Sequence, residues 1–105
     1  MSQEPLQSEL VDDPDMRELI EFFVEELPDR IHAIESALAE GDHLMLQRLT
    51  HQLKGASAGY GFRVIGDAAA QVEDLVKANG APLEEIAGLT CRVQDLLALC
   101  RKAAA

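Results

Sequence analysis

Apolar residues recur with a helical period along most of the chain and predict four helical segments and no strand. The apolar positions of the first segment are Leu19, Ile20, Phe23, Leu27, Ile31, Ile34 and Leu38. We expect Asp13 to cap this segment, Pro14 to occupy its first position, and the helix to run to Ala39. Pro28 lies inside it and removes a hydrogen bond to the Val24 carbonyl, so a kink or two abutting helices are expected there.

Glycine and capping residues mark the second segment. Gly41 and Asp42 are expected to end the first helix and cap the second, which ends at Gly61. Its inward positions are Leu46, Leu49, Leu53, Ala56 and Tyr60, which cluster on one side of the helix at about 100° per residue. The second segment is therefore predicted to place one apolar stripe against a core.

The third and fourth segments are separated by Asn-Gly-Ala-Pro at residues 79–82, a strong stop and restart signal. We expect the third from residue 62 or 63 to residue 78, and the fourth from Leu83 to about Lys102. Short loops between four such segments favour an all-α, antiparallel up-down four-helix bundle. The inward positions are Ile65, Ala68, Ala69, Val72, Leu75 and Val76, then Leu83, Ile86, Leu89, Val93, Leu96, Leu97 and Cys100.

Length and charge limit the function classes. A chain of 105 residues holds one domain with a modest core, which we place at residues 14–103, after a flexible lead at residues 1–13. The formal net charge is −10, from 9 basic and 19 acidic residues. Nucleic acid and anionic membrane surfaces are bound through basic patches, so neither is an expected partner. A soluble acidic bundle of this kind is expected to be a monomer.

Cys91 and Cys100 are nine residues apart in one predicted helix and point in opposite directions, so they cannot form a disulfide with each other. We interpret them as small buried or half-buried side chains in a reducing compartment. No apolar run approaches the length of a spanning helix, and residues 1–13 lack the pattern of a signal peptide. The expected location is cytoplasmic.

His51 is the candidate functional residue, because it lies about 180° from the apolar stripe of its helix. An imidazole in water is mostly neutral at pH 7, so its free nitrogen is available as a nucleophile toward a phosphoryl group. Lys54 offers a cation for the phosphoryl oxygens, and Gly55 leaves room for a partner to approach the ring. The alternative is an ordinary solvated histidine. The other residues on this face are Leu44, Gln47, Arg48 and Ala58.

Three further observations concern the neighbourhood of His51. The tight turn at Gly61 places the second and third helices side by side, so Glu73 or Gln71 is expected to reach the His51 ring and fix its tautomer. The alternative is a solvated glutamate. Arg48, Lys54 and Arg63 are all near His51 in sequence, which weakly favours an acidic partner on this face. Ser57 is expected to bond the backbone carbonyl at i−4.

Other kinds of site lack their patterns in this sequence. His43 and His51 share a face only loosely, His32 belongs to another helix, and no HExxH or CxxC motif is present, so no metal site is expected. There is no GxSxG sequence and no glycine-rich loop of the GxxxxGK[ST] type. A phosphoryl group on His51 must therefore come from another protein.

The run HQLKGASAGYGF resembles the signature of histidine-containing phosphotransfer (HPt) domains. The resemblance covers about residues 14–79, including the helix-turn patterns around residues 23–28 and 37–42. Gly66 departs from it, since the family usually has a small helix former there, and is expected to weaken the third helix. The matching positions are His51, Leu53, Lys54, Gly55, Ser57 and Gly61, followed by Ile65, Val72 and Glu73.

This resemblance implies a carrier without enzymatic activity of its own, which takes a phosphoryl group on His51 from one receiver-domain aspartate and gives it to another. Lys54 would stabilise the phosphoryl charge, and Glu73 is favoured over Gln71 as the partner of the ring. The docking residues would be Gln47, Arg48, Gly55 and Ala58, and the partners receiver domains of response regulators or hybrid histidine kinases. The chain would need no cofactor, because Mg²⁺ belongs to the receiver.

Two alternatives remain open from the sequence. One is an adaptor that binds a receiver or a kinase without phosphoryl transfer. The other is the detached phosphoacceptor domain of a chemotaxis-type or hybrid histidine kinase.

Overall fold

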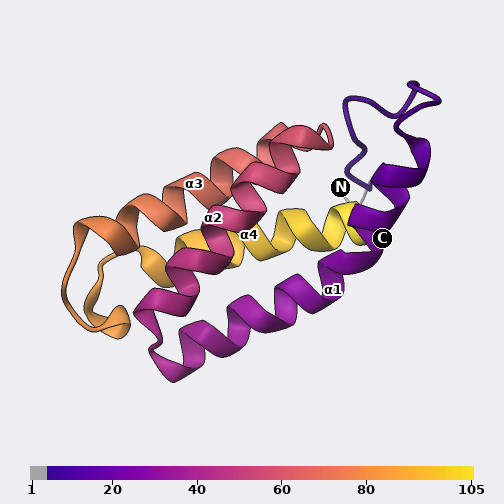
Figure 1. Ribbon diagram of the computed structural model, residues 1–105. Coiled ribbons are helices and arrows are strands. Elements are labelled where there is room, and N and C mark those ends of the chain that lie inside the picture. The colour runs from indigo at the N-terminus through magenta and orange to yellow at the C-terminus, as the bar shows by residue number, and fades with distance from the viewer. Residues whose placement is uncertain (1–4) are drawn as a thin grey trace.

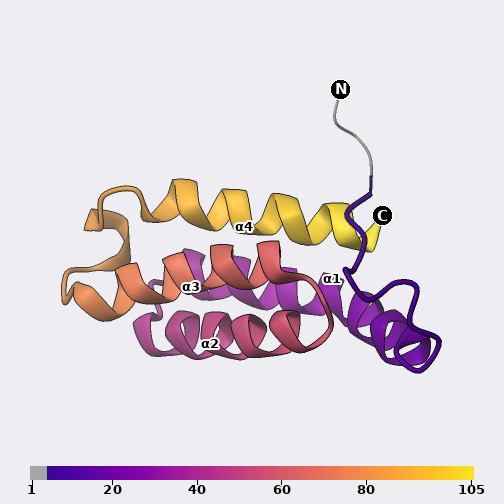
Figure 2. The ribbon, with the colours of Figure 1, turned by 90° about the horizontal axis from the view of Figure 1, so that it is seen from above.

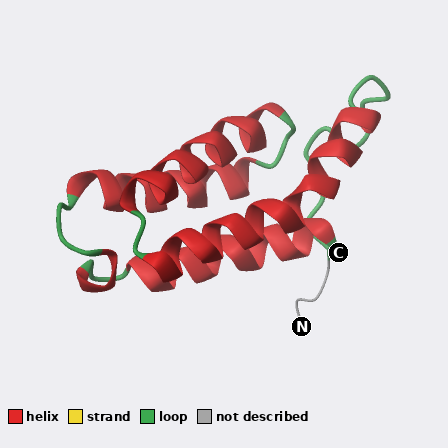
Figure 3. Cartoon of the chain, turned by 60° about the horizontal axis from the view of Figure 1, so that its bottom comes forward, coloured by secondary structure: helices red, strands yellow, loops and turns green. Residues whose placement is uncertain are grey.

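The computed structural model describes residues 5–105, and in this range the chain is helical with no strand (Figures 1 and 3). The expected all-α antiparallel bundle is confirmed: successive helices run in opposite directions and lie side by side (Figures 1 and 2). The elements are α1 (Arg17–Glu40), α2 (His43–Gly59), α3 (Arg63–Ala78), the short 3-10 helix η1 (Leu83–Glu85) and α4 (Leu89–Ala104).

The core lies where the apolar faces of the four helices meet. At one end of it, the ring of Phe23 stacks on Tyr60 and on Phe62, with ring centroids 5.2 and 5.4 Å apart. These contacts join α1 to the turn between α2 and α3. Because α2 contributes Leu46 and Leu53 to the core, both 0% exposed, its opposite face is turned to solvent. The other fully buried large side chains are Leu27, Ile34, Ile65, Val72, Leu83, Leu89, Val93, Leu96 and Leu97.

Gly66 allows α2 and α3 to pack closely, although glycine has a low helix propensity. It is buried at the contact between α2 and α3, and a Cβ added there would lie 3.3 Å from the backbone oxygen of Lys54. A larger side chain would separate the two helices. The departure from the family pattern thus coincides with a close approach of α3 to the helix that carries His51.

The boundary between α1 and α2 is confirmed, whereas the expected start of α1 is wrong. Gly41 adopts the left-handed conformation with φ +68°, and the Asp42 carboxylate accepts a hydrogen bond from the Met45 backbone N–H at 3.0 Å. The Asp13 carboxylate instead accepts from the Asp15 N–H in a preceding turn, and α1 begins three residues later than Pro14, at Arg17.

Pro28 lies within one continuous helix, so the alternative of two abutting helices is wrong. The proline costs α1 the hydrogen bond to the Val24 carbonyl. Burial of Phe23 and Leu27 before it, and of Ile31 and Ile34 after it, holds both halves against the same core. Tertiary packing therefore outweighs the local interruption.

The fourth segment is shorter at its start than expected. Leu83 and Ile86 are buried, as predicted, but they belong to η1 and the following loop. Gly88, with φ +81°, precedes α4, which begins at Leu89. Cys91 is exposed, contrary to expectation, whereas Cys100 is buried, and burial raises the pKa of its thiol to about 11.

The prediction of a flexible lead at residues 1–13 is corrected for residues 5–13, because these residues pack against the bundle. The Leu6 N–H donates to the Lys102 carbonyl at 3.0 Å, and the Glu9 N–H donates to the Gly61 carbonyl at 2.7 Å. Ser8 is buried, and its hydroxyl donates to the Tyr60 carbonyl at 2.6 Å. The expected flexible lead thus contacts both the end of α4 and the turn after α2; residues 1–4 lie outside the described range.

Among the helices of residues 5–105, none is both long enough and apolar enough to cross a membrane.

Candidate functional site

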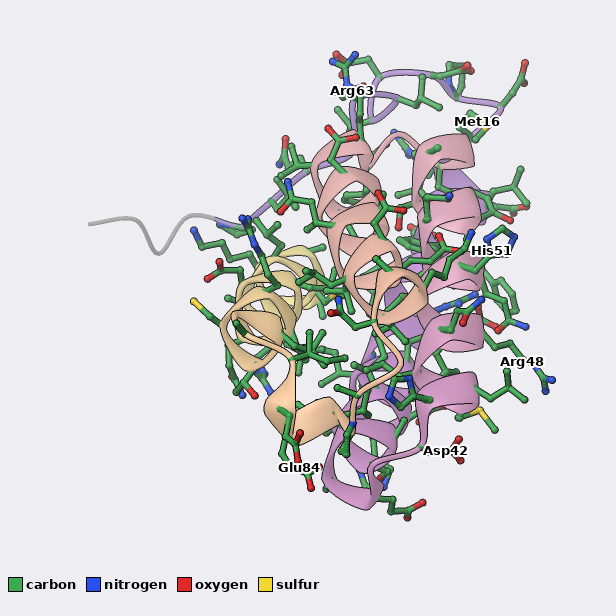
Figure 4. All side chains as sticks on the ribbon, turned by 90° about the vertical axis from the view of Figure 1, so that its left-hand side faces the viewer. Met16, Asp42, Arg48, His51, Arg63 and Glu84 are labelled. Carbon is green, nitrogen blue, oxygen red and sulfur yellow. The ribbon has the colours of Figure 1, made fainter. Side chains whose placement is uncertain are left out.

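The solvent face of α2 presents His51, whose side chain is 67% exposed. Figure 4 shows its ring projecting from the helix on the same side as Arg48. This position follows from the burial of Leu46 and Leu53, which fixes the rotation of α2 about its axis. The predicted orientation of His51 away from the core is therefore seen in the structure.

Glu73 of α3 contacts the His51 ring. Its carboxylate Oε2 lies 2.9 Å from Nδ1 of the imidazole, and its side chain is only 3% exposed. Helices α2 and α3 run antiparallel from the turn at Gly61, which places residue 73 beside residue 51. The alternative prediction, that Gln71 accepts from the His51 ring, is wrong. Gln71 faces α4, where its side-chain oxygen accepts a hydrogen bond from Arg92 at 2.6 Å.

Two lysines approach the same carboxylate. Nζ of Lys54 is 3.1 Å from Oε1 of Glu73, and Nζ of Lys77 is 3.9 Å from Oε2, the oxygen that contacts His51. Both lysine side chains are partly exposed, at 42% and 54%. Lys77 was not identified from the sequence as a residue of this site. Its position four residues after Glu73 on the same helix could have indicated an ion pair between the two side chains.

These contacts set the ionisation of Glu73. Burial raises the pKa of the carboxyl, but the ammonium of Lys54 and the ring of His51 outweigh this effect and lower the pKa below its ordinary value of 4.5. Glu73 is therefore a carboxylate at neutral pH. A carboxylate accepts only, so the proton of a neutral His51 ring lies on Nδ1, which donates to Oε2. The lone pair is then on Nε2.

The remaining predicted site residues divide into two groups. Gln47 and Arg48 line a shallow hollow of about 330 Å³ beside His51, together with Leu44, Glu73 and Lys77. Gly55 and Ala58 do not line it, but both are exposed, and a Cβ added at Gly55 would meet nothing within 4 Å. The helix surface next to His51 is thus open to an approaching protein.

Arg63 does not belong to this site, so its proximity to His51 in sequence was misleading. It lies at the end of the α2–α3 pair where the turn at Gly61 joins the two helices (Figure 4), and it forms an ion pair with Glu9 at 3.1 Å. The cation that takes part in the site instead is Lys77, twenty-six residues after His51 in sequence.

Ser57 does not form the expected bond to the carbonyl at i−4. It is 0% exposed, and its hydroxyl has no hydrogen-bond partner among residues 5–105. The side chain lies at the α2–α3 contact, with its Cβ 3.7 Å from the position that a Cβ on Gly66 would occupy. Thr50 makes the i−4 bond instead, with its hydroxyl donating to the Leu46 carbonyl at 2.9 Å.

The other histidine on α2, His43, has a different environment. Its Nε2 bonds the Ala81 carbonyl and so connects the start of α2 with the loop after α3. Within residues 5–105, no three or more His, Cys, Asp or Glu side chains are placed to hold a metal ion.

The lowered pKa of Glu73 predicts a pH-dependent contribution to stability. A carboxyl whose pKa is lower in the folded protein stabilises it fully above the unfolded pKa, and the contribution is lost as pH falls through the folded pKa. We expect the difference in unfolding free energy between wild type and Glu73→Gln to shrink as pH falls from about 5.5 to about 3, measured by urea denaturation. A difference that stays constant or grows on acidification would contradict the assigned ionisation.

The fold and the site together define a class: a helical bundle that presents a histidine on its surface, with one ring nitrogen held by a buried carboxylate. The sequence model of the Hpt domain family matches residues 18–103. The match covers nearly the whole chain, so this chain belongs to the Hpt domain family. Neither the curated proteins nor the solved structures yielded a match. Hpt domains are phosphoryl carriers that lack a kinase domain and work with receiver domains and histidine kinases in two-component systems.

Proposed function

We propose that this protein carries a phosphoryl group on Nε2 of His51 between the aspartates of two receiver domains. The observation that carries the proposal is the arrangement of the ring: it is exposed to solvent, and Nδ1 is the nitrogen held by Glu73. Only Nε2 combines a lone pair with access to a partner. A plain surface histidine would have no need of a buried carboxylate beneath it.

In the proposed reaction, the Nε2 lone pair attacks phosphorus of the receiver's aspartyl phosphate. The Nε2–P bond forms as the P–O bond to the aspartate breaks, and the aspartate leaves as a carboxylate. The ring keeps its Nδ1 proton and gains positive charge, which the Glu73 carboxylate at 2.9 Å stabilises. Transfer to the second receiver reverses these steps. The receiver, with its Mg²⁺, is expected to neutralise the phosphoryl charge.

Docking is proposed at the face of α2 around His51. Gly55, which has no side chain, and the small Ala58 are exposed on α2, and Gln47 and Arg48 line the hollow beside His51. In a chain with a net charge of −10, Arg48, Lys54 and Lys77 form a local group of cations. Such a group favours the approach of an acidic phosphorylation pocket.

Lys54→Ala is expected to slow phosphoryl transfer several-fold and to leave the bundle folded. The substitution removes the cation paired with Glu73 and lowers the positive charge available to the phosphoryl group. Because the Lys54 side chain is 42% exposed, we expect the unfolding free energy to fall by no more than about 1 kcal/mol. Stopped-flow or quench measurements of transfer, with urea denaturation, check both expectations.

Lys102→Ala is the matched control for Lys54→Ala, because it makes the same change in charge on α4. We expect it to transfer at the wild-type rate. Equal rates for wild type and Lys54→Ala would remove Lys54 from the mechanism.

The function is tested by incubating the protein with radiolabelled phospho-receivers. Transfer of label to the wild type supports the phosphorelay carrier. If receivers bind but none transfers its label, the protein is an adaptor. If a histidine kinase domain with ATP labels the protein directly and receivers do not, it is the phosphoacceptor domain of a kinase.

A further inference from the structure

Lys77 is a charged residue of this site that lies outside the HQLKGASAGYGF run and has no part in the transfer steps proposed above. It lines the hollow beside His51, whereas Lys54 does not. Its Nζ is 3.9 Å from Glu73 Oε2, at the outer limit of an ion pair, while Lys54 Nζ is in closer contact with Oε1 at 3.1 Å. Before phosphorylation, Glu73 thus has a close ion pair with Lys54 and a longer, weaker one with Lys77.

Phosphorylation changes this balance. A phosphoryl group on Nε2 adds about two negative charges beside a carboxylate that is already ionised. The phosphoryl group and the Glu73 carboxylate then compete for the Lys54 ammonium group. Lys54 is 42% exposed and has a flexible stem, so it is free to turn from Glu73 toward the phosphoryl oxygens. That movement would leave the Glu73 carboxylate, which is 3% exposed, with the His51 ring as its one close partner, and the loss of a lysine ammonium from a buried carboxylate is unfavourable.

We propose that Lys77 is a positioning residue for phosphoryl transfer: it takes over the ion pair with Glu73 when Lys54 turns to the phosphoryl group. Lys77 lies one helical turn after Glu73 on α3, and a small rotation of its side chain brings Nζ into full contact with Oε2. Arg48 also lines the hollow but makes no ion pair with Glu73 in the described residues. The inference rests on the proposed use of His51, and its test can be made independent of any receiver.

Phosphoramidate serves as the probe, because this small phosphoryl donor needs no protein docking. The P–N bond of phosphoramidate breaks as the Nε2–P bond to His51 forms, and ammonia leaves. The rate of phosphohistidine formation then reports the chemistry around the ring alone. A residue that only docks a receiver would not alter this rate, whereas one that compensates Glu73 would.

The first comparison is between wild type, Lys77→Met and Lys77→Arg. We expect Lys77→Met to lower the rate of phosphorylation by phosphoramidate about threefold to fivefold, the scale of an exposed ion pair, and Lys77→Arg to restore it. Arg101→Met is the control for charge, since Arg101 pairs with Glu35 away from His51, and it should react at the wild-type rate. Thermal unfolding of each variant establishes that it is folded at the temperature of the assay.

The second comparison repeats Lys77→Met in a Glu73→Gln background, as a double-mutant cycle. If Lys77 acts through Glu73, its removal should change the rate less than about twofold when the carboxylate is absent, roughly the reproducibility of such a cycle. An undiminished effect would overturn the proposal, since Lys77 would then act on the phosphoryl group directly. An unchanged rate for Lys77→Met in the wild-type background would overturn it as well.

Failure of the proposed function gives a different result. In that case phosphoramidate would label His51 with the expected dependence on Lys77, but no phospho-receiver would transfer to the wild type.

Discussion

His51→Gln is expected to abolish phosphoryl acceptance and to leave the bundle folded. The side chain is 67% exposed and contributes nothing to the core, so its loss removes one hydrogen bond, to the Glu73 carboxylate, worth about 1.5–3 kcal/mol. Glutamine keeps a polar side chain at this position but has no nucleophilic nitrogen. Incubation with a radiolabelled phospho-receiver, followed by gel separation, should give label on the wild type and none on the variant.

His32→Gln is the control for His51→Gln. His32 is an exposed histidine on α1, so replacing it tests whether labelling depends on surface histidines in general. We expect this variant to be labelled as the wild type is. Label that persists on His51→Gln would show that another residue is the acceptor and would contradict the assignment of His51 as the phosphoacceptor.

Glu73→Gln is expected to give the second largest loss, a reduction in transfer rate of about 10- to 100-fold, the scale found when the carboxylate that orients a metal-binding histidine is removed. A carboxylate accepts only, which keeps the ring proton on Nδ1. An amide also donates, so it permits the opposite tautomer, in which Nε2 carries the proton and cannot attack. The variant also loses the charge that stabilises the ring during transfer.

Asp74→Asn provides the matched control for Glu73→Gln, because it makes the same chemical change at the next, exposed position of α3. Its transfer rate should equal that of the wild type. Single-turnover rates at a saturating concentration of phospho-receiver separate a chemical effect from weaker docking. A wild-type rate for Glu73→Gln would mean that the contact with His51 is structural only.

The sequence was sufficient to predict four helical segments and the orientation of His51, because both depend on local periodicity, but it did not predict where the first and fourth helices begin. The stripe that contains Leu46 and Leu53 defines which side of α2 is buried, and the opposite side follows from helix geometry. Glu73 was within reach of the same reasoning, since the turn at Gly61 makes α2 and α3 antiparallel neighbours. The choice between Glu73 and Gln71 needed the rotation of α3, which the packing of all four helices determines.

The features that the sequence did not predict depend on contacts between distant residues. Packing of Ser8 against the Tyr60 carbonyl joins positions 52 residues apart, and no local pattern indicates it. Arg63 is near His51 in sequence, but in the folded chain it pairs with Glu9 and takes no part in the site. Gly66 was interpreted through helix propensity alone, whereas its close approach to the Lys54 carbonyl exists only in the packed pair of helices.

The central claim is that the phosphoryl group is carried on Nε2 of His51, and the position of the phosphorus–nitrogen bond tests it most directly. Protein with ¹⁵N-labelled histidine, phosphorylated by a phospho-receiver, gives a resolved ³¹P–¹⁵N coupling in NMR spectra. The account predicts coupling to Nε2 of His51, with Nδ1 still protonated and hydrogen bonded to Glu73. Coupling to Nδ1, or to a histidine other than His51, would contradict it.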